Sequence, residues 1–90
     1  RHALDRGYRA FIAAMETGAI REQIDRGRPV IVCRPILRNL NHYEVVFGYD
    51  RTSGDVFIDD PVRGQLRRSG DSFRRQLEKT GRFALLVVPK

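Results

Sequence analysis

The fold is decided by the stretch Asn41–Asp50, NHYEVVFGYD, together with the shorter stretch Val56–Pro61, VFIDDP. Both are rich in β-branched and aromatic residues, and the segment between them, Arg51–Gly54 (RTSG), has the composition of a turn. This order predicts two antiparallel strands joined as a hairpin. The hairpin places a histidine, His42, near the start of its first strand and aspartates at the end of its second.

Side chains alternate between the two faces of a strand, so one face carries His42, Glu44, Val46, Gly48 and Asp50 and the other carries Tyr43, Val45, Phe47 and Tyr49. We expect the second set to face the core and His42 to lie on the more polar, open face. Asp60 then becomes the partner of His42 if paired residues have numbers that add to an even value. A slip of one residue would give that role to Asp59.

An imidazole beside a carboxylate is the orienting half of a nucleophile, base and acid triad. His42 and Asp60 are therefore candidate catalytic residues. Aspartate before proline is also common turn chemistry, because the residue before proline favours an extended backbone. The spacing by itself leaves both interpretations of Asp60-Pro61 open.

Three motifs follow one another along the chain: GRPVIV at Gly27–Val32, HYEVVFGYD at His42–Asp50, and DPVRG at Asp60–Gly64. Their order and spacing resemble the C-terminal half of C39-like, papain-fold cysteine peptidases, the type that processes double-glycine leaders and bacteriocins. The resemblance covers roughly Ala19 to Pro89. It implies an α+β fold, a papain-like (cysteine proteinase) half-domain with an antiparallel sheet and flanking helices.

The resemblance also implies thiol acyl-enzyme chemistry on peptide bonds, with His42 as general base and Asp60 as the acid that orients the imidazole. In the family the nucleophilic cysteine begins a helix of the N-terminal half, just after a glutamine that helps form the oxyanion hole. No segment of this chain matches that half. The chain has 90 residues and begins at Arg1, so we expect a fragment of a larger chain with the nucleophile upstream.

The partners implied are a peptide or protein substrate and the N-terminal half of the same fold, in the same or a second chain. The alternative is a degenerate, non-catalytic papain-like module that binds a peptide or a partner protein. An upstream cysteine that follows a glutamine favours the peptidase, and its replacement favours the binding module.

The single cysteine, Cys33, follows the apolar run Val30–Val32 and precedes Arg34-Pro35. Its neighbours are strand formers, and a buried thiol is a poor nucleophile, so we interpret Cys33 as a structural residue. One cysteine cannot form an intrachain disulfide, and no cysteine or histidine pair has metal-ligand spacing. We expect neither a metal nor a cofactor.

Helical spacing of apolar residues over Arg1 to Glu16 predicts an N-terminal surface helix. A shorter helix is predicted over Ala19 to Arg26, with Gly27 as its stop. The chain is therefore expected to be one domain with a helical part, residues 1–27, followed by a sheet-rich part, residues 28–90.

In the second part, Val30–Val32 predicts a strand buried on both faces, and Pro35 to Asn41 a connection across the sheet. A helix is expected from about Asp71 to Thr80, with Ser69 or Asp71 as N-cap. A final strand is predicted over Arg82 to Val88. From Phe83 on, the residues of both faces are apolar, which predicts a strand in the centre of the sheet rather than at an open edge.

The composition is basic, with 17 lysines and arginines against 11 acidic residues and a formal charge of +6. The densest group of cations is Arg63, Arg67, Arg68, Arg74 and Arg75. It lacks exposed aromatic residues interleaved for base stacking, so we interpret it as a solvated face and nucleic acid as an unlikely partner. No apolar run approaches the ~20 residues of a membrane span, which leaves membrane contact only to segments outside this chain. The sequence assigns no compartment.

Overall fold

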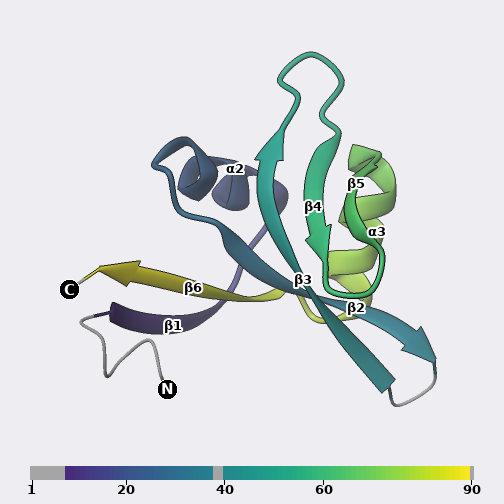
Figure 1. Ribbon diagram of the computed structural model, residues 1–90, viewed down its shortest axis with the longest axis horizontal. Coiled ribbons are helices and arrows are strands. Elements are labelled where there is room, and N and C mark those ends of the chain that lie inside the picture. Colours follow the sequence, from purple (N-terminus) through teal and green to yellow (C-terminus); the bar gives the residue numbers. More distant parts are fainter. Residues whose placement is uncertain (1–7, 38–39, 90) are drawn as a thin grey trace.

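One antiparallel sheet organises the chain (Figure 1). The computed structural model describes residues 8–37 and 40–89. Within these residues the strands are β1 (Tyr8–Ala14), β2 (Val30–Leu37), β3 (Leu40–Tyr49), β4 (Val56–Asp60), β5 (Gly64–Arg68) and β6 (Phe83–Pro89), and the helices are α2 (Thr17–Asp25) and α3 (Gly70–Lys79). The six strands lie in the order β1-β6-β2-β3-β4-β5. The fold is therefore α+β, as expected.

Both helices pack against the same face of the sheet, behind the strands in the view of Figure 1. Ile20 of α2 and Phe73 and Leu77 of α3 are fully buried there. They meet a single apolar cluster from the strands, made of Val30, Val32, Val46, Val56, Ile58 and Ala84. Burying one such side chain contributes roughly 1.5–3 kcal/mol, so this interface holds the helices to the sheet. Neither helix in the described residues is long and apolar enough to span a membrane.

The helices begin and end near the residues that the sequence predicted as cap and stops. The Ser69 hydroxyl accepts a hydrogen bond from the Ser72 backbone N–H at 3.2 Å and caps α3. Gly27 and Gly81 follow the two helices with φ of 76° and 72°, in the left-handed region that glycine adopts at little cost. The predicted stops and the Ser69 cap are confirmed.

The N-terminal helix predicted over residues 1–16 is wrong where the structure describes it. Residues 8–14 form β1, which pairs antiparallel with β6 from Tyr8 opposite Pro89 to Ala14 opposite Phe83. Residues 1–7 lie outside the described part. Strand β6 needs a backbone partner at each edge; β2 supplies one and β1 the other. Tertiary pairing of this kind overrides a weak local helix preference. The central position predicted for the last strand is confirmed.

The connection predicted from Pro35 to Asn41 is mostly strand. β2 continues to Leu37 and β3 starts at Leu40, so the two form a long hairpin whose residues 38 and 39 lie outside the described part. The hairpin of β3 and β4 and its turn are as predicted. The strand β5 was not predicted, because Gly64–Arg68 carries no run of strand-forming residues.

The predicted orientation of β3 is wrong. Glu44 is fully buried at 0% exposure, whereas Tyr43, assigned to the core face, is 65% exposed. The helices cover the face that carries Glu44 and Val46, and ion pairing allows a carboxylate to be buried there. A bulge between Val46 and Gly48 lets Tyr49 pack against the core. Likewise Val30 and Val32 are buried while Ile31, on the other face, is only half-buried.

Candidate functional site

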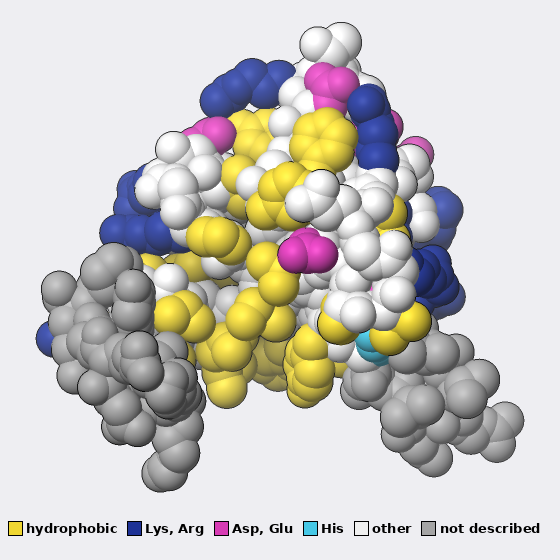
Figure 2. Space-filling view, viewed as in Figure 1, with side chains coloured by type: hydrophobic (Ala, Val, Ile, Leu, Met, Phe, Trp, Pro, Cys, Tyr) yellow, Lys and Arg dark blue, Asp and Glu magenta, His cyan; other side chains and the backbone are white. Residues whose placement is uncertain are grey.

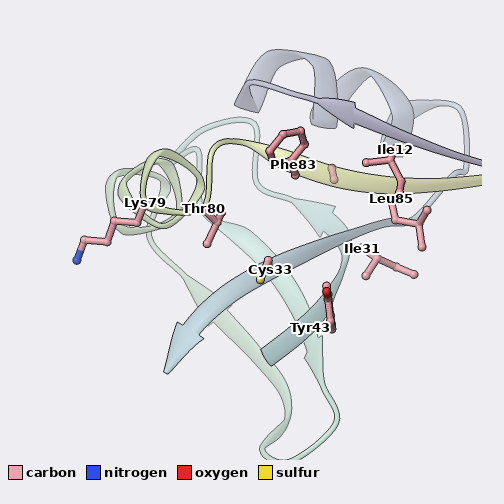
Figure 3. A pocket seen from close by; sticks show the side chains of 9 residues that line it. Ile12, Ile31, Cys33, Tyr43, Lys79, Thr80, Phe83 and Leu85 are labelled. Carbon is pink, nitrogen blue, oxygen red and sulfur yellow. The ribbon is translucent and has the colours of Figure 1, made fainter. Parts of the chain in front are cut away.

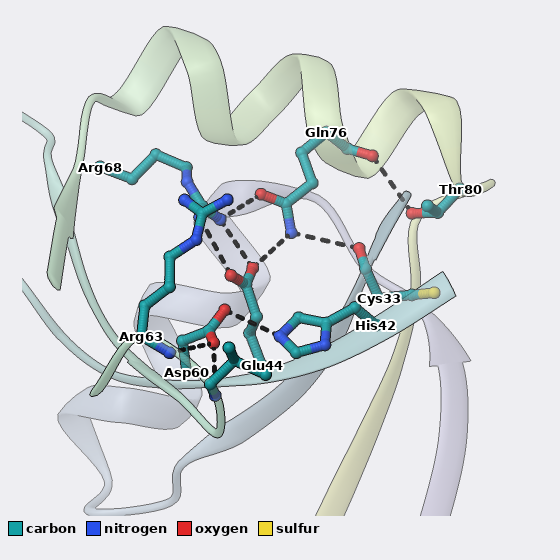
Figure 4. Close-up of polar contacts among 9 residues, drawn as sticks. Cys33, His42, Glu44, Asp60, Arg63, Arg68, Gln76 and Thr80 are labelled. Atoms are coloured by element: carbon teal, nitrogen blue, oxygen red, sulfur yellow. Dashed lines mark hydrogen bonds and ion pairs between the residues drawn. The ribbon is translucent and has the colours of Figure 1, made fainter. Parts of the chain in front are cut away.

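His42 and Asp60 meet on the helix-covered face of the sheet. Strands β3 and β4 pair Val45 with Asp59 and Val46 with Ile58, so the numbers of paired residues add to an even value near the site. Asp60 then lies diagonally across from His42, and the His42 Nε2 to Asp60 Oδ2 distance is 2.9 Å (Figure 4). Asp59 is exposed. The structure therefore joins the two predicted site residues, while their catalytic role stays a prediction.

The Asp60 carboxylate is fixed by the turn that follows it. Its Oδ1 accepts hydrogen bonds from the backbone N–H groups of Val62 and Arg63, each at 2.8 Å. The turn chemistry of Asp60-Pro61 and the pairing with His42 are thus compatible, because each uses a different oxygen. Burial by itself would raise the pKa of Asp60, but its interactions with the Arg63 backbone, the Glu44 side chain, the Val62 backbone and His42 together hold that pKa well below its usual range. The carboxyl group is charged at neutral pH.

The imidazole of His42 is only 14% exposed, and the Asp60 side chain is 0% exposed. Facing a charged carboxylate, Nε2 carries the proton and donates it in the hydrogen bond. The Nδ1 atom then keeps its lone pair. In this tautomer the ring can take a proton from a neighbouring acid while Asp60 stabilises the resulting imidazolium.

A second buried ion pair lies directly behind this one (Figure 4). Arg68 of β5 donates to both carboxylate oxygens of Glu44, at 2.7 and 3.0 Å. Gln76 of α3 donates to the same carboxylate at 3.2 Å and to the Cys33 carbonyl at 3.1 Å, and its own oxygen accepts from Arg68 at 2.5 Å. This network ties β2, β3, β5 and α3 together next to His42.

Sequence reasoning did not identify the Glu44, Arg68 and Gln76 network. Glu44 was assigned to an open polar face, and Arg68 to a solvated cluster of arginines. The available signal was a glutamate alternating with Val46, because a carboxylate at a core-facing position requires a cation. Neither the strand β5 nor the approach of α3 could be inferred from that pattern.

His42, Glu44 and Asp60 are also residues of the types that bind metal ions, and their ligand atoms lie within 4.8 Å of one another. Their oxygens already accept hydrogen bonds: both of Glu44 from Arg68, and those of Asp60 from His42 and from two backbone N–H groups. A metal ion would have to displace a guanidinium group to reach Glu44. The arrangement fits an ion-pair network better than a metal site.

Cys33 lies on the opposite face of the sheet from His42. It is paired with Tyr43 in the β2–β3 register, and both line a cavity of about 630 Å³ (Figure 3). The other residues around this cavity are Ile12, Ile31, Lys79, Thr80, Phe83, Ala84 and Leu85. In Figure 4 the Cys33 sulfur points away from the imidazole. Burial raises the pKa of the Cys33 thiol, and a hydrogen bond from the His42 backbone offsets this only in part.

The arginine cluster is largely neutralised in the structure. Arg67 pairs with Asp50 at 3.0 Å and Asp55 at 2.8 Å, Arg68 pairs with Glu44, and Arg74 lies 3.4 Å from Asp71. The interpretation as a simply solvated face is therefore wrong for Arg68, whose side chain is mostly buried.

Two of three comparisons with known proteins found a match. A model of the Peptidase_C39 like family matches residues 2–84. Among solved structures, the crystal structure of a protein described as a C39-like peptidase from Bacillus anthracis has a TM-score of 0.73 and 17% identity, over 90% of this chain and 52% of that one. This chain thus spans about half the length of that structure. A comparison with curated proteins gave no match.

Proposed function

The chain belongs to the Peptidase_C39 like family, and we propose that it supplies the base and the orienting acid of a C39-like cysteine peptidase. The observation that carries this proposal is the 2.9 Å contact between His42 Nε2 and the buried Asp60 carboxylate, which two backbone N–H groups hold in place. A general base requires a neighbour that fixes its tautomer and ring orientation, and Asp60 meets both requirements.

In the proposed reaction His42 Nδ1 takes the proton of a cysteine thiol. The thiolate attacks the carbonyl carbon of a peptide bond, and the imidazolium returns the proton to the leaving amine. The base then takes a proton from water, which attacks the thioester and releases the acid product and the free thiol. Asp60 stays charged throughout and stabilises the imidazolium that forms in each half of the cycle.

The nucleophile of this reaction comes from polypeptide outside the 90 residues. The thiol of Cys33 lies on the other face of the sheet with a raised pKa, and is unsuited to the role. The aligned part of this chain covers only 52% of the structural relative, which supports a half-domain that another half, in the same or a second chain, completes.

The surface of the chain supports the same interpretation. Hydrophobic side chains gather over the centre of the sheet face that carries no helix (Figure 2). Exposed residues on this face include Ile12, Tyr43, Phe47 and Phe83. Soluble monomers rarely expose contiguous apolar areas of this kind unless they mark an interface. We assign this face to contact with the N-terminal half of a papain-like fold. The nucleophile of that half would reach His42 around the end of the sheet, where we also place the peptide or protein substrate.

The proposal is tested by labelling the full-length protein with an iodoacetamide-type probe and mapping the modified cysteine. The expected result is rapid labelling of a cysteine upstream of Arg1, lost in His42→Ala and retained in His2→Ala, which changes the other histidine of the chain. A cysteine that reacts no faster than a free thiol, or equal labelling in both variants, would overturn the proposal. The chain would then be a non-catalytic papain-like module that binds a peptide or a partner protein.

A further inference from the structure

Two carboxylates lie side by side in the buried part of the site. The Glu44 and Asp60 side chains are both fully buried, and their oxygens lie within 4.8 Å of each other and of a His42 ring nitrogen. Only Asp60 touches the imidazole. Like charges at this distance disfavour one another in a low-dielectric interior, so such a pair persists only with nearby cations.

We propose that Glu44 and Arg68 are positioning residues that set the charge balance around the His42–Asp60 pair. Arg68 is the counter-charge of Glu44, held by two parallel hydrogen bonds, and it offsets the repulsion between the two carboxylates. The role of these residues in catalysis rests on the proposed function. Their electrostatic effect on the His42–Asp60 pair does not, because it depends only on the structure.

The charges can be counted within this buried cluster. Glu44 and Asp60 each contribute minus one and Arg68 plus one, so these three hydrogen-bonded groups together place one net negative charge beside His42. Negative charge beside a histidine ring stabilises an imidazolium, and the imidazolium is the form that pairs with a thiolate in thiol peptidase chemistry. Glu44 acts indirectly. It supplies negative charge near the ring, while Asp60 makes the hydrogen bond to the ring nitrogen.

The groups that face His42 come from four strands and one helix. Glu44, Asp60 and Arg68 come from β3, β4 and β5, and α3 contributes the neutral Gln76. On β2, Arg34 lies directly across from His42, and Cys33 contributes its carbonyl group to Gln76. Arg34 is unchanged in every variant below, so its charge is common to all the comparisons.

Gln76 restrains the position of the Glu44 carboxylate. Its amide donates to Glu44 and to the Cys33 carbonyl while its oxygen accepts from Arg68. A glutamine held at three points leaves the carboxylate little freedom to turn away from the site. The negative charge of Glu44 therefore stays at a fixed distance from the ring.

The test is a pH titration of the His42 ring signal by NMR in the isolated protein, which needs neither nucleophile nor substrate. Glu44→Gln removes one negative charge and keeps the shape, so the midpoint should fall by roughly one pH unit. Adding Arg68→Met removes the matching positive charge and should return the midpoint toward that of the wild type. Asp59→Asn removes an exposed carboxylate from the same hairpin as a control and should leave the midpoint in place.

An unchanged midpoint in Glu44→Gln, or a double variant displaced further than the single one, would overturn the proposal. A merely structural role predicts the second pattern, because two substitutions disturb packing more than one. If Glu44→Gln does not fold, the double variant decides, since replacing both members of a buried ion pair leaves no uncompensated buried charge. A wild-type midpoint there supports the charge balance, and a displaced one overturns it.

The titration and the labelling experiment fail independently. If the midpoints move as expected but no upstream cysteine reacts, the peptidase assignment falls and the charge balance of the cluster stands. If the labelling succeeds but the midpoints do not move, the peptidase assignment stands and the charge-balance role of Glu44 and Arg68 falls. In an active full-length protein, Glu44→Gln should also lower the activity. The decrease should be largest in the pH range where activity depends on the imidazolium.

Discussion

Cys33 and His42 lie on adjacent strands of one hairpin but on opposite faces of the sheet. In the β2–β3 register Cys33 pairs with Tyr43, and His42 pairs with Arg34. Because consecutive residues alternate between faces, this offset of one residue directs the thiol and the imidazole to opposite sides. The hydrogen bond that Gln76 donates to the Cys33 carbonyl holds this part of β2 against the site without exposing the sulfur to it.

Cys33→Ser should therefore leave peptidase activity of the complete protein nearly unchanged. The hydroxyl replaces a thiol in a largely apolar cavity, so the free energy of unfolding should fall by about 1 kcal/mol. Peptide hydrolysis and urea unfolding measure the two effects. Complete loss of activity in a folded Cys33→Ser protein would mean that Cys33 is the nucleophile after all.

Thiol labelling of Cys33 should be slow at neutral pH and should accelerate only above the pH at which an ordinary cysteine becomes reactive. The reason is that burial raises the pKa of the thiol, and the thiolate is the form that alkylates. Labelling rates between pH 7 and 10, compared with those of the urea-unfolded protein, measure this. Equal rates in folded and unfolded protein would contradict it.

Asp60→Asn should lower kcat by roughly 10²-fold or more, because the amide no longer fixes the tautomer of His42. It should also change stability in a pH-dependent way. The pKa of Asp60 is lowered on folding, so the charged carboxyl stabilises the folded state above the unfolded-state pKa of about 4, and this contribution is lost as the pH falls further.

Unfolding free energies of the wild type and Asp60→Asn, measured between pH 7 and pH 3, should accordingly differ most above pH 4 and converge below it. Asp59→Asn is the matched control, since its side chain is exposed on the same strand. A difference that grows as the pH falls would contradict the depressed pKa of Asp60.

Gly70→Ala should destabilise the protein by about 1–3 kcal/mol. A Cβ atom at Gly70 would lie 2.8 Å from the Gly54 carbonyl oxygen, so the start of α3 and the β3–β4 turn would have to separate. Gly18→Ala, at the start of the other helix, is the control: a Cβ there meets nothing within 4 Å. It should be neutral or stabilising by up to about 1 kcal/mol. Equal effects of the two substitutions in urea unfolding would contradict the close approach.

Ile12→Lys should reduce self-association of the isolated chain with little loss of stability. Ile12 is 76% exposed on the apolar sheet face, so a lysine removes contact area without disturbing the core. Val62→Lys is the control. Val62 is 82% exposed in the β4–β5 turn, so this substitution adds the same charge at another exposed position. Sedimentation velocity over a range of concentrations measures association. A monomeric wild type would show that the apolar face does not associate by itself.

The sequence was most informative where local chemistry and tertiary pairing favour the same structure. The β3–β4 hairpin has strand formers on both sides of a turn, and α3 has a serine cap, an apolar stripe and a glycine stop. Segment 8–14 was predicted wrongly. The spacing of its apolar residues fits a helix, but in the structure the segment pairs as β1 with the edge of β6. That edge is created by a strand about 70 residues later, which no local pattern can reveal.

What the sequence by itself determined was a set of parts: the β3–β4 hairpin, the helix α3, the final strand, and the glycines that end the helices. These follow from side-chain alternation, turn residues and backbone sterics, which act over a few residues. Only the tertiary structure decided which face of the sheet is buried. The reason is that burial of Glu44 depends on Arg68 and Gln76, whose positions are fixed by a strand and a helix that follow it in the chain.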